Sequence, residues 1–186
     1  GIEVFATGGI GGVDKGAEAS FDISADLDEL ARTGVIVVSA GAKAILDIAK
    51  TLEVLETRGV PVVAYRSDVV PAFWSRTSPH PAPLRLDEPG AIARFFATRR
   101  ELGIGGGMLV ANPVAPEDEI AADEMAGVIA AAQAAAEAAL VAGKAVTPFL
   151  LAKILELTGG ASLKTNIALV ENNARLAASI ARALKG

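Results

Sequence analysis

The sequence has 186 residues, enough for one domain with a well-filled core and short for two. Its net charge is −5, and it has no basic block or basic–aromatic stripe of the kind that binds nucleic acid. With no cysteine and a single histidine, it excludes disulfides, Cys-based clusters and His-based metal centres. A bound metal would need carboxylate oxygens, which Mg²⁺ and Mn²⁺ prefer.

No signal peptide precedes the first apolar segment, so we expect a cytoplasmic protein with no membrane partner. The most apolar long segment, residues 125–143, is interrupted by Gln133 and Glu137 on one helical face. Because Ala is only weakly apolar, we predict a buried or interface helix there instead of a membrane span.

Apolar strands alternate with helices along the chain. Strands are predicted at 2–7, 35–40, 60–65 and 108–112, helices at 26–33, 42–57, 89–102, 122–142, 147–158 and 162–185, and a proline-rich loop at 76–90. This alternation predicts an α/β fold in which a mostly parallel sheet is flanked by helices, with a helical C-terminal third. Residues 1–186 show no internal repeat and are expected to form a single α/β unit.

Polar or glycine-rich segments follow three of the predicted strands, at residues 7–12, at 39–43 and from Asn112 onward. Sites in parallel sheets lie at the carboxyl ends of strands, so these segments are expected to converge.

The first of these segments belongs to FATGGIGGVDKGAE, residues 5–18. It matches neither the G-x-G-x-x-G nor the phosphate-loop pattern of nucleotide-binding proteins. Two interpretations stay open: a turn where no Cβ fits, or a ring of backbone N–H groups around an anion or sugar.

Two carboxylates flank a hydroxyl in FDISADLDE, residues 21–29. In extended chain Asp22, Ser24 and Asp26 share one face, which suits a cation or sugar site. Asp26 also fits a helix N-cap, because Glu29 follows three residues later. Asp22 has no such local role and is the better candidate metal ligand.

Lys43 lies where a buried strand is predicted to turn into a helix, in SAGAKAIL. The positive end of a helix dipole disfavours a cation in the first turn. Together with partial burial, it would favour the neutral amine that forms a Schiff base. A lysine that extends to solvent or binds a phosphate as a charge is the alternative.

Asn166 lies on an otherwise apolar face of the final predicted helix. A buried amide needs hydrogen-bond partners, which neighbouring backbone or a ligand could supply.

Taken together, these segments resemble the pseudouridine-5′-phosphate glycosidase family. The resemblance runs through nearly the whole chain and rests on the segments VFATGGIGGV, KGAEASFDISADL, VVSAGAKAILDI, LETRGVPVVAY, PAFWSR, LVANP and TPFLLAKILELTGGASLKTNIALVENNARLA. It implies reversible cleavage of the C–C glycosidic bond of pseudouridine 5′-phosphate to uracil and ribose 5-phosphate.

The resemblance also implies roles for individual residues. Lys43 would form a Schiff base with C1′ of the opened sugar, and Asp22 would bind Mn²⁺. Substrate contacts would come from Ser24, Ala25, Asp26 and Asn166, with Thr7 and Gly9 of the glycine loop against the ribose phosphate. The family is trimeric, so a homotrimer is expected.

The sequence departs from the family in two respects. The family pattern GGVHRGAE reads GGVDKGAE here, with Asp14 and Lys15 replacing histidine and arginine. The family is also longer at its N-terminus, where it carries several strands, a second substrate-binding lysine and the glutamate that protonates uracil. That portion would have to come from the same or a separate chain. Two alternatives remain: a C-ribosylating enzyme with another aglycone, and a catalytically impaired relative that only binds sugar phosphate.

Overall fold

The computed structural model describes residues 1–141 and 143–186. Its described part contains a five-stranded parallel sheet in the order β1-β2-β5-β3-β4. The strands are β1 (Val4–Ala6), β2 (Ile36–Ser39), β3 (Val62–Tyr65), β4 (Leu84–Leu86) and β5 (Met108–Ala111). The α/β fold with a parallel sheet is confirmed.

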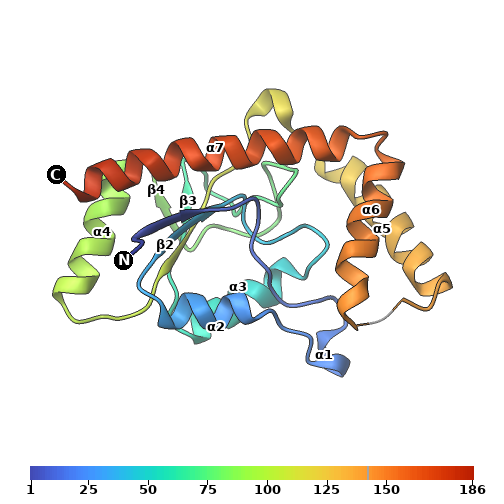
Figure 1. The fold of residues 1–186 in the computed structure, drawn as a ribbon, viewed down its shortest axis with the longest axis horizontal. Coiled ribbons are helices and arrows are strands. Elements are labelled where there is room, and N and C mark those ends of the chain that lie inside the picture. Colours follow the sequence, from blue (N-terminus) through green and yellow to red (C-terminus); the bar gives the residue numbers. More distant parts are fainter. Residues whose placement is uncertain (142) are drawn as a thin grey trace.

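Helices cover both faces of this sheet (Figure 1). They are α1 (Ala17–Ser20), α2 (Ala25–Arg32), α3 (Ile48–Thr57), α4 (Pro89–Glu101), α5 (Ala122–Ala138), α6 (Val146–Leu157) and α7 (Ala161–Leu184), with 3-10 turns η1 (Pro116–Asp118) and η2 (Gly143–Ala145). The helical C-terminal third is confirmed. Of the predicted helix 122–142, Ala142 lies outside the described residues.

Alternating residues of the central strands β2, β3 and β5 pack into two apolar clusters. Ile36 and Val38 of β2 face one way, toward α4 and α7, whereas Val37 faces the other, toward α2 and α3. This period of two is the geometry of an extended strand, and it explains why the strands read as continuous apolar runs. In Figure 1 α7 runs along one side of the sheet, with α2 and α3 on the opposite side.

Three elements differ from the sequence predictions, namely β4, α3 and α1. The proline-rich loop 76–90 contains β4, a short edge strand that pairs with β3. The helix predicted from residue 42 begins only at Ile48, where Asp47 accepts a hydrogen bond from the Lys50 amide at 3.0 Å. Helix α1 was not predicted.

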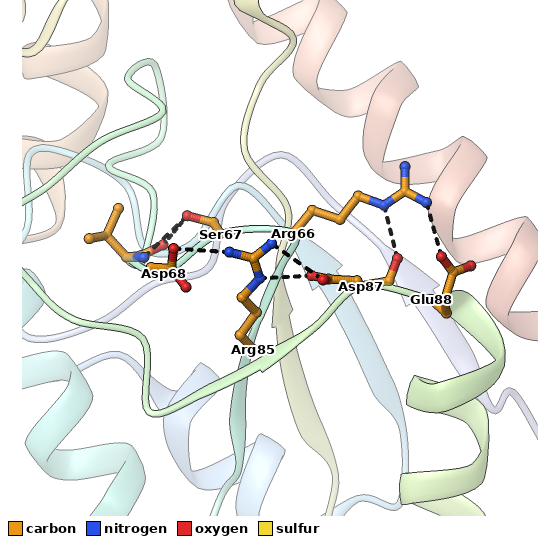
Figure 2. Close-up of polar contacts among 7 residues, drawn as sticks. Arg66, Ser67, Asp68, Arg85, Asp87 and Glu88 are labelled. Carbon is orange, nitrogen blue, oxygen red and sulfur yellow. Dashed lines mark hydrogen bonds and ion pairs between the residues drawn. The ribbon is translucent and has the colours of Figure 1, made fainter.

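Exposed ion pairs hold β4 at its edge of the sheet (Figure 2). Arg85 of β4 contacts Asp68 at 2.9 Å and Asp87 at 2.8 Å. Arg66, which follows β3, donates to the Asp87 carbonyl at 2.9 Å and lies 3.5 Å from the Glu88 carboxylate. These contacts tie the ends of β3 and β4 to the start of α4.

On length and apolar character, no single helix among the described residues qualifies to span a membrane. Helices α6 and α7 qualify only as a pair, which is bent by 113° at their junction. On α5, Met125, Ile129, Ala132 and Ala136 form one buried face, whereas most of its other residues are exposed, so the helix covers the core from its surface.

Candidate active site

The glycine loop after β1 and the loop after β2 run side by side. The Ala40 amide donates to the Gly8 carbonyl at 2.8 Å, and the Ile10 amide donates to the Gly41 carbonyl at 3.0 Å. The Lys43 amide then donates to the Ile10 carbonyl at 3.1 Å. The parallel pairing of β1 and β2 therefore continues past the ends of both strands. The Asn112 backbone amide donates to the Ser39 carbonyl at 2.7 Å, so all three predicted junctions meet.

Lys43 lies in this second loop and is half-buried. Its backbone amide is bonded to Ile10, and the following helix begins five residues later at Ile48. The prediction that Lys43 occupies a first helical turn is therefore wrong, and the dipole argument built on it does not apply. Pairing with the glycine loop holds this segment out of the helix.

Close packing explains the glycines of the first loop. A Cβ on Gly9 would lie 2.6 Å from the Phe73 ring, and one on Gly11 would lie 2.6 Å from the Ser24 Cβ. The Gly11 amide donates to the Asp26 carboxylate at 2.7 Å. Of the two interpretations from the sequence, the turn in which no Cβ fits accounts for Gly9 and Gly11.

Phe73 covers Gly9, a contact that sequence reasoning missed. Its backbone adopts φ 59°, which is uncommon for a residue with a side chain, and its amide donates to the Ala40 carbonyl at 3.1 Å. Trp74 packs edge-on against the Phe73 ring, with centroids 4.7 Å apart. The only sequence signal was the presence of both aromatics in PAFWSR.

A cavity of about 670 Å³ opens beside these loops. Four of the predicted site residues line it, namely Thr7, Gly9, Asp26 and Lys43. The remaining lining comes from β1, the glycine loop, α2 and the segment around β2, and it is mostly apolar: Ile2, Phe5, Ile10, Glu29, Leu30, Thr33, Val35 and Val37. This volume lies within the range of small-molecule sites.

Ser24, not Asp26, takes the N-cap role that the sequence predicted for Asp26. Ser24 is the N-cap of α2 and accepts a hydrogen bond from the Asp26 amide at 3.2 Å. Asp26 lies in the first turn, where its carboxylate accepts from Gly11. The N-cap prediction for Asp26 is wrong by two residues, because the helix begins at Ala25 and places the Ser24 hydroxyl at its N-terminus.

Asp22 lies apart from the cavity and is exposed. Its carbonyl accepts from the Asp14 amide at 3.0 Å, so the two residues are close. Burial and the negative charge of Asp22 raise the pKa of the Asp14 carboxyl, while the positive charge of Lys43 opposes that rise. Asp14 is thus coupled electrostatically to both Asp22 and Lys43.

Asn166 of α7 is half-buried, and its Oδ1 lies 3.2 Å from the place a Cβ on Gly8 would take. It therefore borders the glycine loop from the helix side. Ala25 begins α2 and is exposed.

Within residues 1–141 and 143–186, no three His, Cys, Asp or Glu side chains gather closely enough to hold a metal ion. The carboxylates of Asp14 and Asp22 come from neighbouring segments and offer the oxygen donors that Mn²⁺ accepts. They would fill only part of its coordination shell.

Comparison with known proteins gives close relatives. Residues 1–183 match the family model described as "Indigoidine synthase A like protein". The pseudouridine-5′-phosphate glycosidase of Mesorhizobium japonicum is 77% identical over 184 residues, 99% of this chain and 60% of that protein. The enzyme of the same name from Methylobacterium nodulans is 68% identical over 100% of this chain and 55% of its own length.

Two solved structures share the fold. Prealnumycin C-glycosynthase AlnA, solved in complex with ribulose 5-phosphate, superposes with a TM-score of 0.92 at 37% identity over 98% of this chain and 60% of that one. An indigoidine synthase A-like protein from Thermotoga maritima gives 0.86 at 38% identity, covering 99% and 59%. The chain thus spans about 60% of the length of the proteins that it matches, and it belongs to the indigoidine synthase A-like family.

Proposed function

We propose that the protein cleaves the C–C glycosidic bond of pseudouridine 5′-phosphate reversibly to uracil and ribose 5-phosphate, acting with the residues that its relatives carry beyond this chain. The observation that carries the proposal is the Lys43 side chain at a cavity of about 670 Å³, beside a glycine loop too closely packed for side chains. The name shared by relatives 77% and 68% identical supports it.

Lys43 would act as the nucleophile. Its neutral amine forms a bond to C1′ as the bond from C1′ to the ring oxygen breaks, and a proton passes from the nitrogen to the released oxygen, which restores the nitrogen lone pair. The bond from C1′ to uracil then breaks, its electron pair stays with the uracil carbon, which takes a proton, and the nitrogen lone pair forms an iminium at C1′. Water hydrolyses the iminium, which releases ribose 5-phosphate and restores the amine.

The proton for uracil would come from the glutamate that the resemblance assigns to the longer family chain. The open edge of the sheet supports the idea that further chain packs here. Ile2 and Phe5 at β1 are 77% and 51% exposed, although both line the cavity. Apolar side chains in such a place suit a covering segment.

Mn²⁺ bound through Asp22, with Asp14 as a second carboxylate, is part of the proposal. Such an ion would supply positive charge and a bound water beside the phosphate-bearing substrate. The rest of its coordination shell would come from water or from the additional residues. We also propose a homotrimer acting in the cytoplasm, and Ala-rich helices such as α5 have the small side chains that suit subunit contacts.

The deciding experiment is borohydride reduction in the presence of ribose 5-phosphate, using protein of full family length. We expect a sugar-phosphate mass on the peptide that contains Lys43, together with uracil release from pseudouridine 5′-phosphate. No adduct, or an adduct on another lysine, would overturn the proposed role of Lys43.

A related C-ribosylating function is the second candidate, and the superposition with AlnA favours it. Both reactions would use the same lysine and sugar phosphate and differ in the aglycone. Turnover of uracil compared with an aromatic acceptor separates them, and we expect uracil because the more similar relatives share that activity by name.

A further inference from the structure

Helix α7 carries two adjacent asparagines that bind loops at the carboxyl edge of the sheet. Asn172 donates to the Pro113 carbonyl after β5 at 3.0 Å. Asn173 donates to two carbonyls after β1, those of Thr7 at 2.8 Å and Gly8 at 3.3 Å. Neighbouring residues of one helix thus hold two strand ends.

A second amide fixes the Asn173 side chain. Its Oδ1 accepts from the Asn112 Nδ2 at 3.0 Å, and both side chains are buried. The orientation is unambiguous because the Thr7 and Gly8 carbonyls can only accept, so the NH₂ group must face them. The Asn112 backbone N–H donates to the Ser39 carbonyl at 2.7 Å, so residues at the ends of β1, β2 and β5 are connected.

Burial alone does not account for an asparagine at this position. Asn173 has 0% of its surface exposed, and its neighbours on the same helix face, Leu169, Leu176 and Ala177, are apolar. Placing an amide there costs free energy unless its hydrogen bonds are made. The bonds that it makes lead to the glycine loop and to Asn112.

The glycine loop transmits this contact to Lys43. The Gly8 carbonyl that Asn173 binds also accepts from the Ala40 amide, at 2.8 Å. The same pairing continues through Ile10 to the Lys43 amide. The Thr7–Gly8 turn is held by backbone bonds to the β2 side and by the Asn173 side chain; among the described residues no strand pairs with the outer side of β1.

We propose that Asn173, oriented by Asn112, is a positioning residue that fixes the Thr7–Gly8 turn and thereby the backbone of the Lys43 loop. The part that concerns catalysis rests on the proposed function of Lys43. The part that concerns loop rigidity does not.

Two variants test the inference. Asn173→Leu keeps the branching and the number of heavy atoms of the side chain and removes every hydrogen bond that it makes, whereas Asn112→Ala leaves Asn173 in place but removes the donor to its Oδ1. Arg99→Met is the matched control, because Arg99 is also buried and also donates to two loop carbonyls, of Gly105 and Gly107, but before β5 instead of after it.

Two measurements are made on protein of full family length. Amide hydrogen exchange follows peptides that contain Ile10 and Lys43, and borohydride trapping gives the rate of adduct formation at saturating ribose 5-phosphate. For Asn173→Leu we expect exchange at least tenfold faster in both peptides and trapping at least tenfold slower. For Asn112→Ala we expect the exchange rates of the same two peptides and the trapping rate to change in the same direction but by less. For Arg99→Met we expect a lower melting temperature, with the exchange rates and the trapping rate within twofold of the parent.

Exchange that rises equally throughout the protein would overturn the inference, because it would mean a purely structural role. Unchanged exchange at Ile10 and Lys43, or a trapping rate within twofold of the parent in Asn173→Leu, would also overturn it. If the parent protein forms no adduct, the proposed function fails, and the exchange measurement still decides whether the two amides hold the loop.

Discussion

Two groups of charged side chains lie at the same edge of the sheet and are held in opposite ways. Around the ends of β3 and β4 the charges are exposed and paired with one another (Figure 2): Arg66, Asp68, Arg85, Asp87 and Glu88. Beside β1 and β2, none of Asp14, Asp22, Asp26 and Lys43 forms an ion pair with another described residue. Charges that satisfy one another stabilise a loop, whereas charges without an ion-pair partner are available to a ligand.

The difference also appears in the backbone. Exposed ion pairs such as Arg85–Asp87 are individually weak because water screens them, and several of them together tie down the short edge strand β4. The loops near Lys43 are instead held by backbone pairing, buried amides and glycines in close contact. Contacts of this kind fix the backbone of a loop more closely than surface ion pairs do. They also leave the charged side chains of the site without ion-pair partners.

Removing Lys43 should have the largest effect. Lys43→Ala is expected to lower turnover by ~10³-fold or more, because the nucleophile is lost, with little change in melting temperature. Lys50→Ala is the control, since Lys50 is an exposed lysine paired with Glu18 and Asp47. Steady-state kinetics on both variants measures the contrast, and equal losses would mean that the two lysines do not differ in role.

Adding a methyl group to the glycine loop should reduce stability. Gly11→Ala is expected to lower the free energy of unfolding by about 1–3 kcal/mol, because the new Cβ would meet Ser24. Gly127→Ala in α5 has open space and should raise that free energy by about 0.5–1 kcal/mol. Urea unfolding compares the two, and the same sign for both changes would contradict the role of close packing.

One acidic side chain from each of the two groups can be shortened to compare a carboxylate bonded to backbone, Asp26, with a carboxylate in exposed ion pairs, Asp87. Asp26→Ala leaves the Gly11 amide without its acceptor and should cost about 1–2 kcal/mol of unfolding free energy. Asp87→Ala breaks exposed pairs and should cost less unfolding free energy than Asp26→Ala, with a loss that shrinks in high salt. A larger loss for Asp87→Ala would reverse the comparison.

The smallest expected effect is the pH dependence from Asp14. Burial and Asp22 raise the pKa of this carboxyl, so the folded state disfavours its ionised form. Ionised Asp14 therefore lowers stability at neutral pH, and this cost disappears as the pH falls toward the ordinary carboxyl range. Because the side chain is only half-buried, Asp14→Asn should gain at most about 1 kcal/mol at pH 7 and less at pH 4.

The free energy of unfolding of the parent and Asp14→Asn, measured at pH 7 and at pH 4 in a buffer that contains a chelator, checks this prediction. The gain should shrink when Asp22→Asn is already present, since the like charge is then gone. A gain that grows toward acid pH would contradict the raised pKa.

Sequence periodicity located the strands and helices that form the core. Continuous apolar runs such as residues 35–40 and 108–112 are observed as β2 and β5, because a strand covered on both faces must be apolar throughout. It missed β4, which has three residues between prolines and turns and gains its stability from pairing with β3. It also placed the start of α3 too early, because the pairing of Lys43 with Ile10 is a contact between distant segments.

For the site, the sequence by itself determined which residue types stand at the carboxyl ends of the strands and that the glycine loop is no nucleotide motif. The tertiary structure decided which of them meet. It brought Thr7, Gly9, Asp26 and Lys43 to one cavity, left Asp22 beside Asp14, placed Phe73 over Gly9 and buried Asn173 against the first loop. Local sequence specifies backbone preference and periodicity, whereas these contacts join segments up to 166 residues apart and arise only when the helices pack on the sheet.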